Sequence, residues 1–569
     1  MRKWITWFLA VWLSVLPAVA QQAPAPPQPP AAMTEMAQKG VSLKPDVLTP
    51  SRGLYSNTTD LLRDKDSAKI LNNLQQLQRG IWTSRGIGYT KERAGSFNSG
   101  ATFLEFAQHT TSAGVNRLWF QVGSKAYSYD LSSHTETEIK SGLNTTNIPC
   151  IRSYNPSNMI YTNGDINPLK WDGNPASSMS NLSGWPATIA SVTYEKPKYC
   201  EVFANRAVFA GFDAKPFNIV VSNQGDPTSY TVSGAATDAG AFEVPSQLGK
   251  ITGMRALRLS NDNNDQVLIV GCERGMALIT GYSGTTFAMK DLTREYGLAS
   301  NRSWIQLQND LLFWSTDGLR RFSQLVTNAN LINASLTFNL QDLVNRVNTS
   351  KLEKIFAVHH PATQEVQFWL PIDSDTNPKN AVIMNYNTRD PSSDSYEQLN
   401  PVFSTKDGIS TLSAGIEYSN TMYCGTTDGY LQTHYSGDTY DGTTIAWDFM
   451  TPLISANSPA QNASSRKFVI ITDGPAQQFT ARAYTVDTLS GGNTEFKVRD
   501  SRSLSVATSS ITKIGTWASG TTTNYPHLID FSSKGSGRYW ALRLTGSSSG
   551  DHISLVGVQS ILTVGGWKQ

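Results

Sequence analysis

Short apolar runs, each followed by a tight polar turn and a second apolar run, recur along the middle of the chain. In the first unit, residues 117–122 form the first run, Gly123 lies in the turn and residues 126–129 form the second run. Runs of aromatic and β-branched residues bounded by turn residues are typical of antiparallel β-hairpins. The first runs of the seven units begin at Arg117, Met159, Ala207, Val267, Leu311, Val366 and Thr421.

Several of these units carry Asn-Gly or Asp-Gly at the turn, as at Gly164, Gly318 and Gly429. A tight hairpin needs a positive φ there, which glycine adopts without steric cost. A small sheet that recurs roughly every fifty residues is the signature of a β-propeller. We therefore predict an all-β fold with a six- or seven-bladed propeller over residues 101–440. Stacked β-sandwiches are the alternative, but the regular place of the turn within each unit favours the propeller.

The pattern changes on both sides of this repeat. Over residues 441–569, short strand-like runs alternate with Ser, Gly and Thr loops, which predicts a C-terminal β-sandwich. Before the repeat, Leu61, Leu71, Leu74 and Leu77 lie near helical spacing. They predict a short helix over residues 60–77, within a lead-in segment that spans residues 51–100.

The N-terminus has the three parts of a secretory signal peptide. Arg2 and Lys3 precede an apolar run at residues 4–16, and Ala18 and Ala20 frame a small-residue cleavage site. We expect residues 1–20 to stand apart from the fold and residues 21–50 to form a Pro- and Ala-rich linker. Export to a secreted or periplasmic location is one reading, and retention of the apolar segment is the other.

The composition argues against a protein that grips nucleic acid through charge. Its formal net charge is +2 and only 16% of its residues are charged, whereas phosphate neutralisation requires a basic patch. The four cysteines, Cys150, Cys200, Cys272 and Cys424, are widely spaced and form no CxxC pair. A zinc knuckle is therefore not expected, and small buried residues on strands are the simplest interpretation. A disulfide stays open if the protein meets an oxidising compartment.

The sequence predicts no catalytic, cofactor-binding or metal-binding residues. His359 and His360 form the only histidine cluster, but neighbouring residues on a strand point to opposite faces. Residues 546–550 spell G-x-S-x-G in a Ser/Gly-rich stretch, where we expect a turn. Residues 85–88 are too short for a phosphate loop, and residues 262–265 lack the spacing of a calcium loop. Residues 315–318 carry the glycine one place too early for the Asp box of sialidases.

Several segments together resemble tail hub, nozzle or stabilisation proteins of short-tailed bacteriophages. The resemblance extends over about residues 50–565 and rests on the order and spacing of the segments. It departs from the family where a turn usually written Arg-Pro-Gly lacks its proline, near Arg85. The segments are residues 53–54, 68–73, 79–86, 168–173, 206–211, 220–222, 226–230, 296–299, 311–319, 451–453 and 466–468.

This resemblance implies a non-enzymatic structural protein of the virion tail. Copies would form a homo-oligomeric ring, expected to be a hexamer, below portal and adaptor proteins. The ring would continue and gate the DNA channel, pass double-stranded DNA without sequence-specific binding, and carry tail fibres or spikes. The alternatives are a secreted propeller that binds glycans or proteins at a cell surface, and a secreted propeller hydrolase or lyase. The last would need converging acids or a metal at the central axis.

Overall fold

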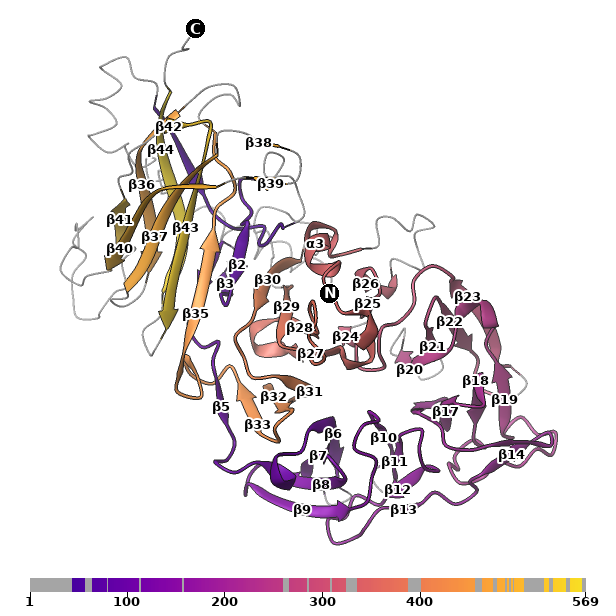
Figure 1. Cartoon of the computed structure of the whole chain (residues 1–569). Coiled ribbons are helices and arrows are strands. Elements are labelled where there is room, and N and C mark those ends of the chain that lie inside the picture. The colour runs from indigo at the N-terminus through magenta and orange to yellow at the C-terminus, as the bar shows by residue number, and fades with distance from the viewer. Residues whose placement is uncertain are drawn as a thin grey trace, which may run out of the picture.

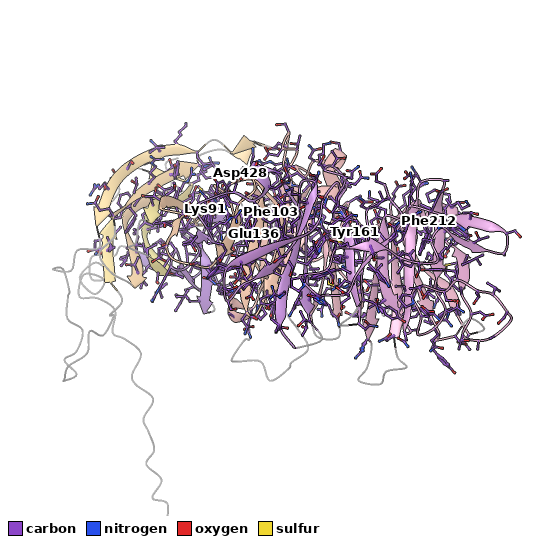
Figure 2. All side chains as sticks on the ribbon, turned by 90° about the horizontal axis from the view of Figure 1, so that it is seen from below. Lys91, Phe103, Glu136, Tyr161, Phe212 and Asp428 are labelled. Atoms are coloured by element: carbon purple, nitrogen blue, oxygen red, sulfur yellow. The ribbon has the colours of Figure 1, made fainter. Side chains whose placement is uncertain are left out.

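The structure is nearly all β and has two parts, a ring of small sheets and a sandwich beside it (Figure 1). Seen edge on, the ring is a flat disc with the sandwich at one end (Figure 2). The computed structural model describes residues 43–56, 64–78, 80–111, 114–155, 158–258, 266–283, 286–307, 310–323, 335–386, 401–455, 463–473, 478–486, 489–490, 493–494, 496–505, 527–531, 536–548 and 553–564.

The ring is a seven-bladed β-propeller in which each blade is an antiparallel sheet that begins at its innermost strand. Blades one to three contain β6 (Phe103–Thr110), β7 (Asn116–Val122), β8 (Lys125–Asp130) and β9 (Thr135–Lys140); β10 (Cys150–Asn155), β11 (Asn158–Thr162), β12 (Leu169–Trp171) and β13 (Ser180–Asn181); and β16 (Tyr199–Phe203), β17 (Arg206–Phe212), β18 (Lys215–Val221) and β19 (Gly240–Glu243). Blades four to six contain β20 (Ile251–Arg258), β21 (Gln266–Cys272), β22 (Met276–Thr280) and β23 (Ala288–Thr293); β24 (Trp304–Leu307), β25 (Asp310–Ser315) and β26 (Gly318–Arg321); and β27 (Phe356–His360), β28 (Glu365–Leu370), β29 (Asn380–Asn385) and β30 (Val402–Lys406).

The seventh blade is built from both ends of the propeller sequence, which closes the ring. Its strands are β31 (Leu412–Tyr418), β32 (Thr421–Thr426), β33 (Leu431–His434) and, outermost, β5 (Tyr89–Lys91) from before the first blade. Tyr89 of β5 pairs with His434 and its ring stacks between those of His434 and Tyr440. The innermost strands β31 and β6 then lie side by side, so the last blade packs on the first.

The apolar core of the propeller lies between neighbouring blades. On β7, Leu118, Phe120 and Val122 pack toward the seventh blade, while Trp119 packs toward the second. Successive residues of a strand point to opposite faces, and here both faces are covered. This explains why the middle strands are continuous apolar runs rather than alternating ones.

The sandwich combines strands from both ends of the chain. One sheet contains β1 (Leu43–Leu48), β3 (Gln75–Gln78), β4 (Ile81–Thr83), β44 (Ser554–Val564), β36 (Ala463–Asp473), β41 (His527–Phe531) and β42 (Ser536–Gly537). The other contains β40 (Lys497–Ser505), β37 (Gln478–Val486), β43 (Tyr539–Ser548), β35 (Thr443–Met450) and β2 (Ile70–Asn72). The described smaller elements are the hairpins β14 (Ala187–Ile189) with β15 (Val192–Tyr194) and β38 (Leu489–Ser490) with β39 (Asn493–Thr494), the strand β34 (Thr439–Tyr440), helix α3 (Gln341–Val344) and short 3-10 turns at Phe97–Gly100, Ser246–Leu248, Phe338–Leu340, Thr349–Lys354 and Pro361–Thr363.

Strand β2 joins the sandwich to the propeller. It pairs in antiparallel register with β35 of the sandwich and, at Asn72, in parallel with Thr405 of the sixth blade. One continuous apolar cluster then extends from the fifth and sixth blades, at Trp314 and Phe368, into the sandwich at Phe468 and Trp540. The two parts therefore share a core.

The helix predicted over residues 60–77 is wrong for the described part of that segment. Residues 70–72 and 75–78 are the strands β2 and β3, and Asn73 between them has a φ of 54°. Leu71 and Leu74 are buried in the core that the sandwich shares with the propeller rather than along a helix face. The expected linker over residues 21–50 also differs, because residues 43–48 form β1 at the edge of β44.

Candidate functional site

Charged side chains occupy the same position on the innermost strands of the first three blades. Glu105, Arg152 and Glu201 are each the third residue of β6, β10 and β16. Arg255 follows on β20 of the fourth blade, and Arg302 lies two residues before β24 of the fifth. Since these strands line the centre of the ring, the side chains meet near the propeller axis.

Arg302 connects several blades through their backbones. Its Nη1 donates to the carbonyls of Leu104 (3.0 Å) and Ser413 (2.7 Å), and its Nη2 donates to that of Lys354 (3.3 Å). Its Nε lies 3.9 Å from the Glu105 carboxylate. Burial raises the pKa of Glu105, against the opposing effect of Arg302, and burial also lowers the pKa of Arg302. These bonds fix the axis and leave Arg302 little freedom to bind a ligand.

Arg152 and Glu201 form a second pair, between neighbouring inner strands. The Arg152 Nε lies 3.0 Å from the Glu201 carboxylate, whose side chain is 9% exposed. Burial opposes the charge of Arg152, but negative charge on the adjacent Cys150 and Glu201 side chains raises its pKa overall. This pair joins the second blade to the third and satisfies the carboxylate.

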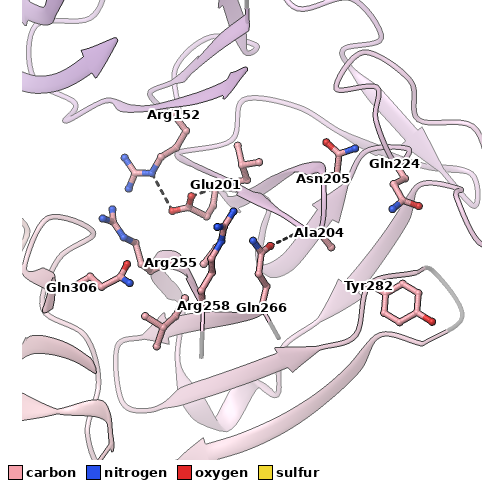
Figure 3. Close-up of a pocket in the computed structure, with 13 residues that line it drawn as sticks. Arg152, Glu201, Ala204, Asn205, Gln224, Arg255, Arg258, Gln266, Tyr282 and Gln306 are labelled. Carbon is pink, nitrogen blue, oxygen red and sulfur yellow. Dashed lines mark hydrogen bonds and ion pairs between the residues drawn. The ribbon is translucent and has the colours of Figure 1, made fainter. Parts of the chain in front are cut away.

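Beside this pair lies a pocket of about 690 Å³ near the C-terminal ends of the inner strands. Figure 3 shows Arg255 and Arg258 within it, close to Glu201. Among the described residues, neither guanidinium has a hydrogen-bond or ion-pair partner. Burial and the nearby Arg152 lower the pKa of Arg255. The polar lining residues are Arg152, Glu201, Asn205, Gln224, Arg255, Arg258, Gln266, Tyr282 and Gln306.

A second cavity of about 620 Å³ lies at the opposite ends of the inner strands. Its lining includes Arg302 and residues that precede the inner strands, such as Lys198, Lys250 and Lys354. Asp213, Glu273 and Glu353 also line it, so its charges are nearly balanced. The first pocket has the stronger charge bias, with three arginines against one glutamate.

The four cysteines are buried thiols on strands, as the sequence indicated. Cys150 and Cys200 sit on the neighbouring inner strands β10 and β16. The Cys150 Sγ donates to the Cys200 carbonyl (3.1 Å), and the Cys200 Sγ donates to that of Cys150 (3.4 Å). The interaction with the Cys200 side chain lowers the pKa of the Cys150 thiol, whereas burial raises that of Cys200.

The two adjacent histidines have separate partners, as predicted for neighbours on a strand. His359 Nε2 bonds with the Tyr386 hydroxyl (2.7 Å). His360 Nδ1 bonds with Thr363 Oγ1 (2.7 Å), and its ring stacks on that of Tyr435 at 4.1 Å. Burial lowers the pKa of His360 to about 4. In the described parts of the chain, no group of three or more His, Cys, Asp and Glu side chains could hold a metal ion.

The remaining sequence motifs that the structure describes lie on strands or in the turns between them. Residues 546–548 of the G-x-S-x-G stretch end β43 rather than form a turn, and a Cβ on Gly546 would lie 2.5 Å from the Trp447 ring. Residues 85–88 lead into β5, where the Gly88 N–H bonds to the Gly437 carbonyl (3.0 Å). Asp317 in the turn before β26 pairs with Arg320. Residues 262–265, 549–550 and the signal-like segment 1–20 lie outside the described residues.

Sequence reasoning missed the axial charges, although a signal for them exists. A charged residue at the third position of the inner strand in three successive blades would have marked them. Their strands are less apolar than the central hairpins and lie outside the apolar runs from which the units were predicted.

Comparison with known proteins adds little to this geometry. No protein-family model matches the chain, and no curated protein matches it. One similar solved chain is described as "Crystal Structure of Mitotic Checkpoint Complex"; the match is 9% identical, covers 62% of this chain and 93% of that chain, and has a TM-score of 0.37. A likeness at this level supports no statement about function. No helix in the described residues is long and apolar enough to cross a membrane.

Proposed function

We propose that the protein is a non-enzymatic structural component of a virion, the tail hub or nozzle of a short-tailed phage. The observation that carries this proposal is the order of family-like segments along the chain, from Gly53 in the lead-in to Phe468 in the sandwich. In this proposal, copies assemble as a ring below the portal and adaptor, continue and gate the DNA channel, and support fibres or spikes.

The rigidity of the protomer supports this function. A subunit of a closed ring must hold its two interfaces at a fixed angle, because heterologous contacts close only at the correct rotation. The propeller and sandwich share an apolar core and the strand β2, so they are suited to act as one wedge. In such a ring the DNA channel would lie between copies, since Arg302 and its partners occupy the axis of each propeller.

Native mass spectrometry of the full chain at micromolar concentration tests the proposal. We expect a closed oligomer, six copies in the simplest case, that binds portal and adaptor proteins when these are added. A strictly monomeric protein under these conditions would contradict it. The ring does not require removal of residues 1–20, whereas secretion does. The mass of the subunit, measured in the same experiment, shows whether these residues are present.

The signal-like N-terminus favours one alternative, a secreted propeller that binds glycans or proteins at the cell surface. That function requires removal of residues 1–20. N-terminal sequencing of the mature protein distinguishes the secreted propeller from the tail protein. A mature chain that begins at Gln21 supports secretion, and a chain that retains Met1 excludes it.

A further inference from the structure

The axial pocket between Arg152 and Gln306 carries an excess of positive charge. Its lining holds three arginines and one glutamate, and that glutamate is already paired with Arg152. Nearby, Glu105 and Arg302 lie 3.9 Å apart, and this pair adds no net charge. Within the described residues, the guanidinium groups of Arg255 and Arg258 therefore have no hydrogen-bond or ion-pair partner, although Glu201 partly offsets the charge of Arg255.

An unpaired guanidinium in a partly buried site is unfavourable, and an oxyanion would relieve it. Burial and Arg152 both lower the pKa of Arg255 and outweigh the opposing effect of Glu201, so the charge of Arg255 is only partly compensated. The planar guanidinium fork matches a carboxylate or phosphate and binds it through two parallel hydrogen bonds. Arg255 and Arg258 come from the same strand, β20, and both reach this space (Figure 3).

The rest of the lining fits a hydroxyl-rich molecule. Asn205, Gln224, Gln266 and Gln306 present side-chain amides, which both donate and accept hydrogen bonds. The Tyr282 ring is 57% exposed at the pocket and offers an apolar face. A volume of about 690 Å³ is in the range of small-ligand sites.

We propose that this pocket binds an acidic saccharide, a sugar bearing a carboxylate or phosphate ester, whose oxyanion is held by Arg255 and Arg258. The amide side chains around them hold the sugar hydroxyls. The site belongs to one protomer, so it does not depend on ring assembly or on the tail-hub proposal.

Isothermal titration of the full chain at low ionic strength tests this site. The probes are galacturonic acid and glucose 6-phosphate, with galactose and glucose as uncharged controls and inorganic phosphate as a control for the oxyanion alone. We expect both acidic sugars to bind, neither neutral sugar to bind, and inorganic phosphate to bind about tenfold more weakly or worse. Binding should also weaken as salt is added.

Substitutions locate the site. Arg255→Gln and Arg258→Gln should each weaken binding of the acidic sugars by about tenfold or more, because each removes a charge-assisted hydrogen bond. Arg294→Gln is the matched control, since Arg294 pairs with Asp291 on the outer strand of the same blade and should leave binding unchanged. Arg258 is exposed, so its variant serves if Arg255→Gln fails to fold.

Three outcomes would overturn the proposal. The first is that neither galacturonic acid nor glucose 6-phosphate binds at millimolar concentration. The second is an affinity for inorganic phosphate equal to that for the acidic sugars, which would show that the pocket recognises the oxyanion alone and not a saccharide. The third is unchanged affinity in both arginine variants of folded protein, which would place the ligand elsewhere.

Discussion

At the scale of single residues, buried charges in this protein persist where backbone carbonyls or a partner charge take up their hydrogen bonds. Arg206 is fully buried, and its guanidinium donates to the carbonyls of Ser222, Ala236, Thr237 and Asp238. Such groups would cost several kcal/mol if they were left unpaired. Arg302 follows the same rule at the axis, whereas Arg255 departs from it, and that departure marks the pocket.

A second buried polar cluster lies between the sixth and seventh blades and gives a pH-dependent prediction. The Glu365 carboxylate accepts hydrogen bonds from Tyr435 and Thr363, and Lys406 donates to the Ile87 carbonyl (2.7 Å). Burial raises the pKa of Glu365 to about 7 and lowers that of Lys406 to about 8. The folded state therefore holds the Glu365 proton at pH values where the unfolded chain has lost it.

Glu365→Gln should remove the loss of stability that the raised pKa of Glu365 causes as pH increases. The pKa of Glu365 is about 4.5 in the unfolded chain and about 7 in the folded protein. Between these pH values the folded state binds the extra proton, so the free energy of unfolding of the wild-type protein falls as pH rises. The variant carries no such proton, so its stability relative to wild type should rise by up to about 3 kcal/mol across this window. Urea unfolding at about pH 5 and pH 7.5 measures the change, and Glu243→Gln, at an exposed position, should show none. An equal difference at both pH values would contradict the prediction.

At the scale of strands and turns, the sequence pattern predicted the middle strands of every blade but little of its inner and outer strands. The seven apolar runs that begin at residues 117 to 421 coincide with the second strands, from β7 to β32, because both faces of these strands are buried between blades. The inner strands carry axial charges and the outer strands face solvent, so neither gives a clean apolar run. The lead-in was misread because the leucines at 71 and 74 satisfy helical spacing, although the turn at Asn73 rather than a helix brings them to one core.

The turn of the seventh blade shows which glycines the closure of the ring requires. Gly429 has a φ of 81°, and a Cβ there would lie 2.8 Å from the Phe97 carbonyl oxygen of the lead-in. Gly437 has a φ of 80° but open space around it. Gly437→Ala should cost about 1 kcal/mol of stability, the price of the left-handed backbone, and Gly429→Ala about 2–4 kcal/mol, because the lead-in backbone must also move. Chemical unfolding of the two variants measures the difference, and equal costs would mean that the contact with Phe97 is easily relieved.

At the scale of the whole molecule, distant parts of the sequence complete each domain. The segment before the first blade closes the seventh, and strands from both chain ends build the sandwich. These pairings could not be predicted from local patterns, because each short strand is stabilised by a partner hundreds of residues away. The axial site has the same origin, since its side chains come from four separate blades. The residues of the site are visible in the sequence, but their convergence depends on the ring.

This organisation predicts that the propeller and sandwich unfold together. Asn73 lies at their junction, where its Nδ2 donates to Asp407 (2.8 Å) and to the Ala446 carbonyl (2.7 Å), and its Oδ1 accepts from the Asp407 N–H (2.9 Å). Glycine tolerates the positive φ of this position, so Asn73→Gly removes these bonds without backbone strain. We expect a loss of about 2–4 kcal/mol in the free energy of unfolding.

Differential scanning calorimetry of the wild type and Asn73→Gly tests this coupling. Both should show one transition, at lower temperature in the variant, because the apolar cluster from Trp314 to Trp540 still connects the two parts. Asn420→Gly is the control: Asn420 also has a positive φ, of 62°, but lies exposed at a hairpin tip, so its substitution should change the midpoint little. Two separate transitions in the wild type, with only the sandwich transition lowered by Asn73→Gly, would show that the shared cluster does not couple them, and a rigid wedge would then lose its physical basis.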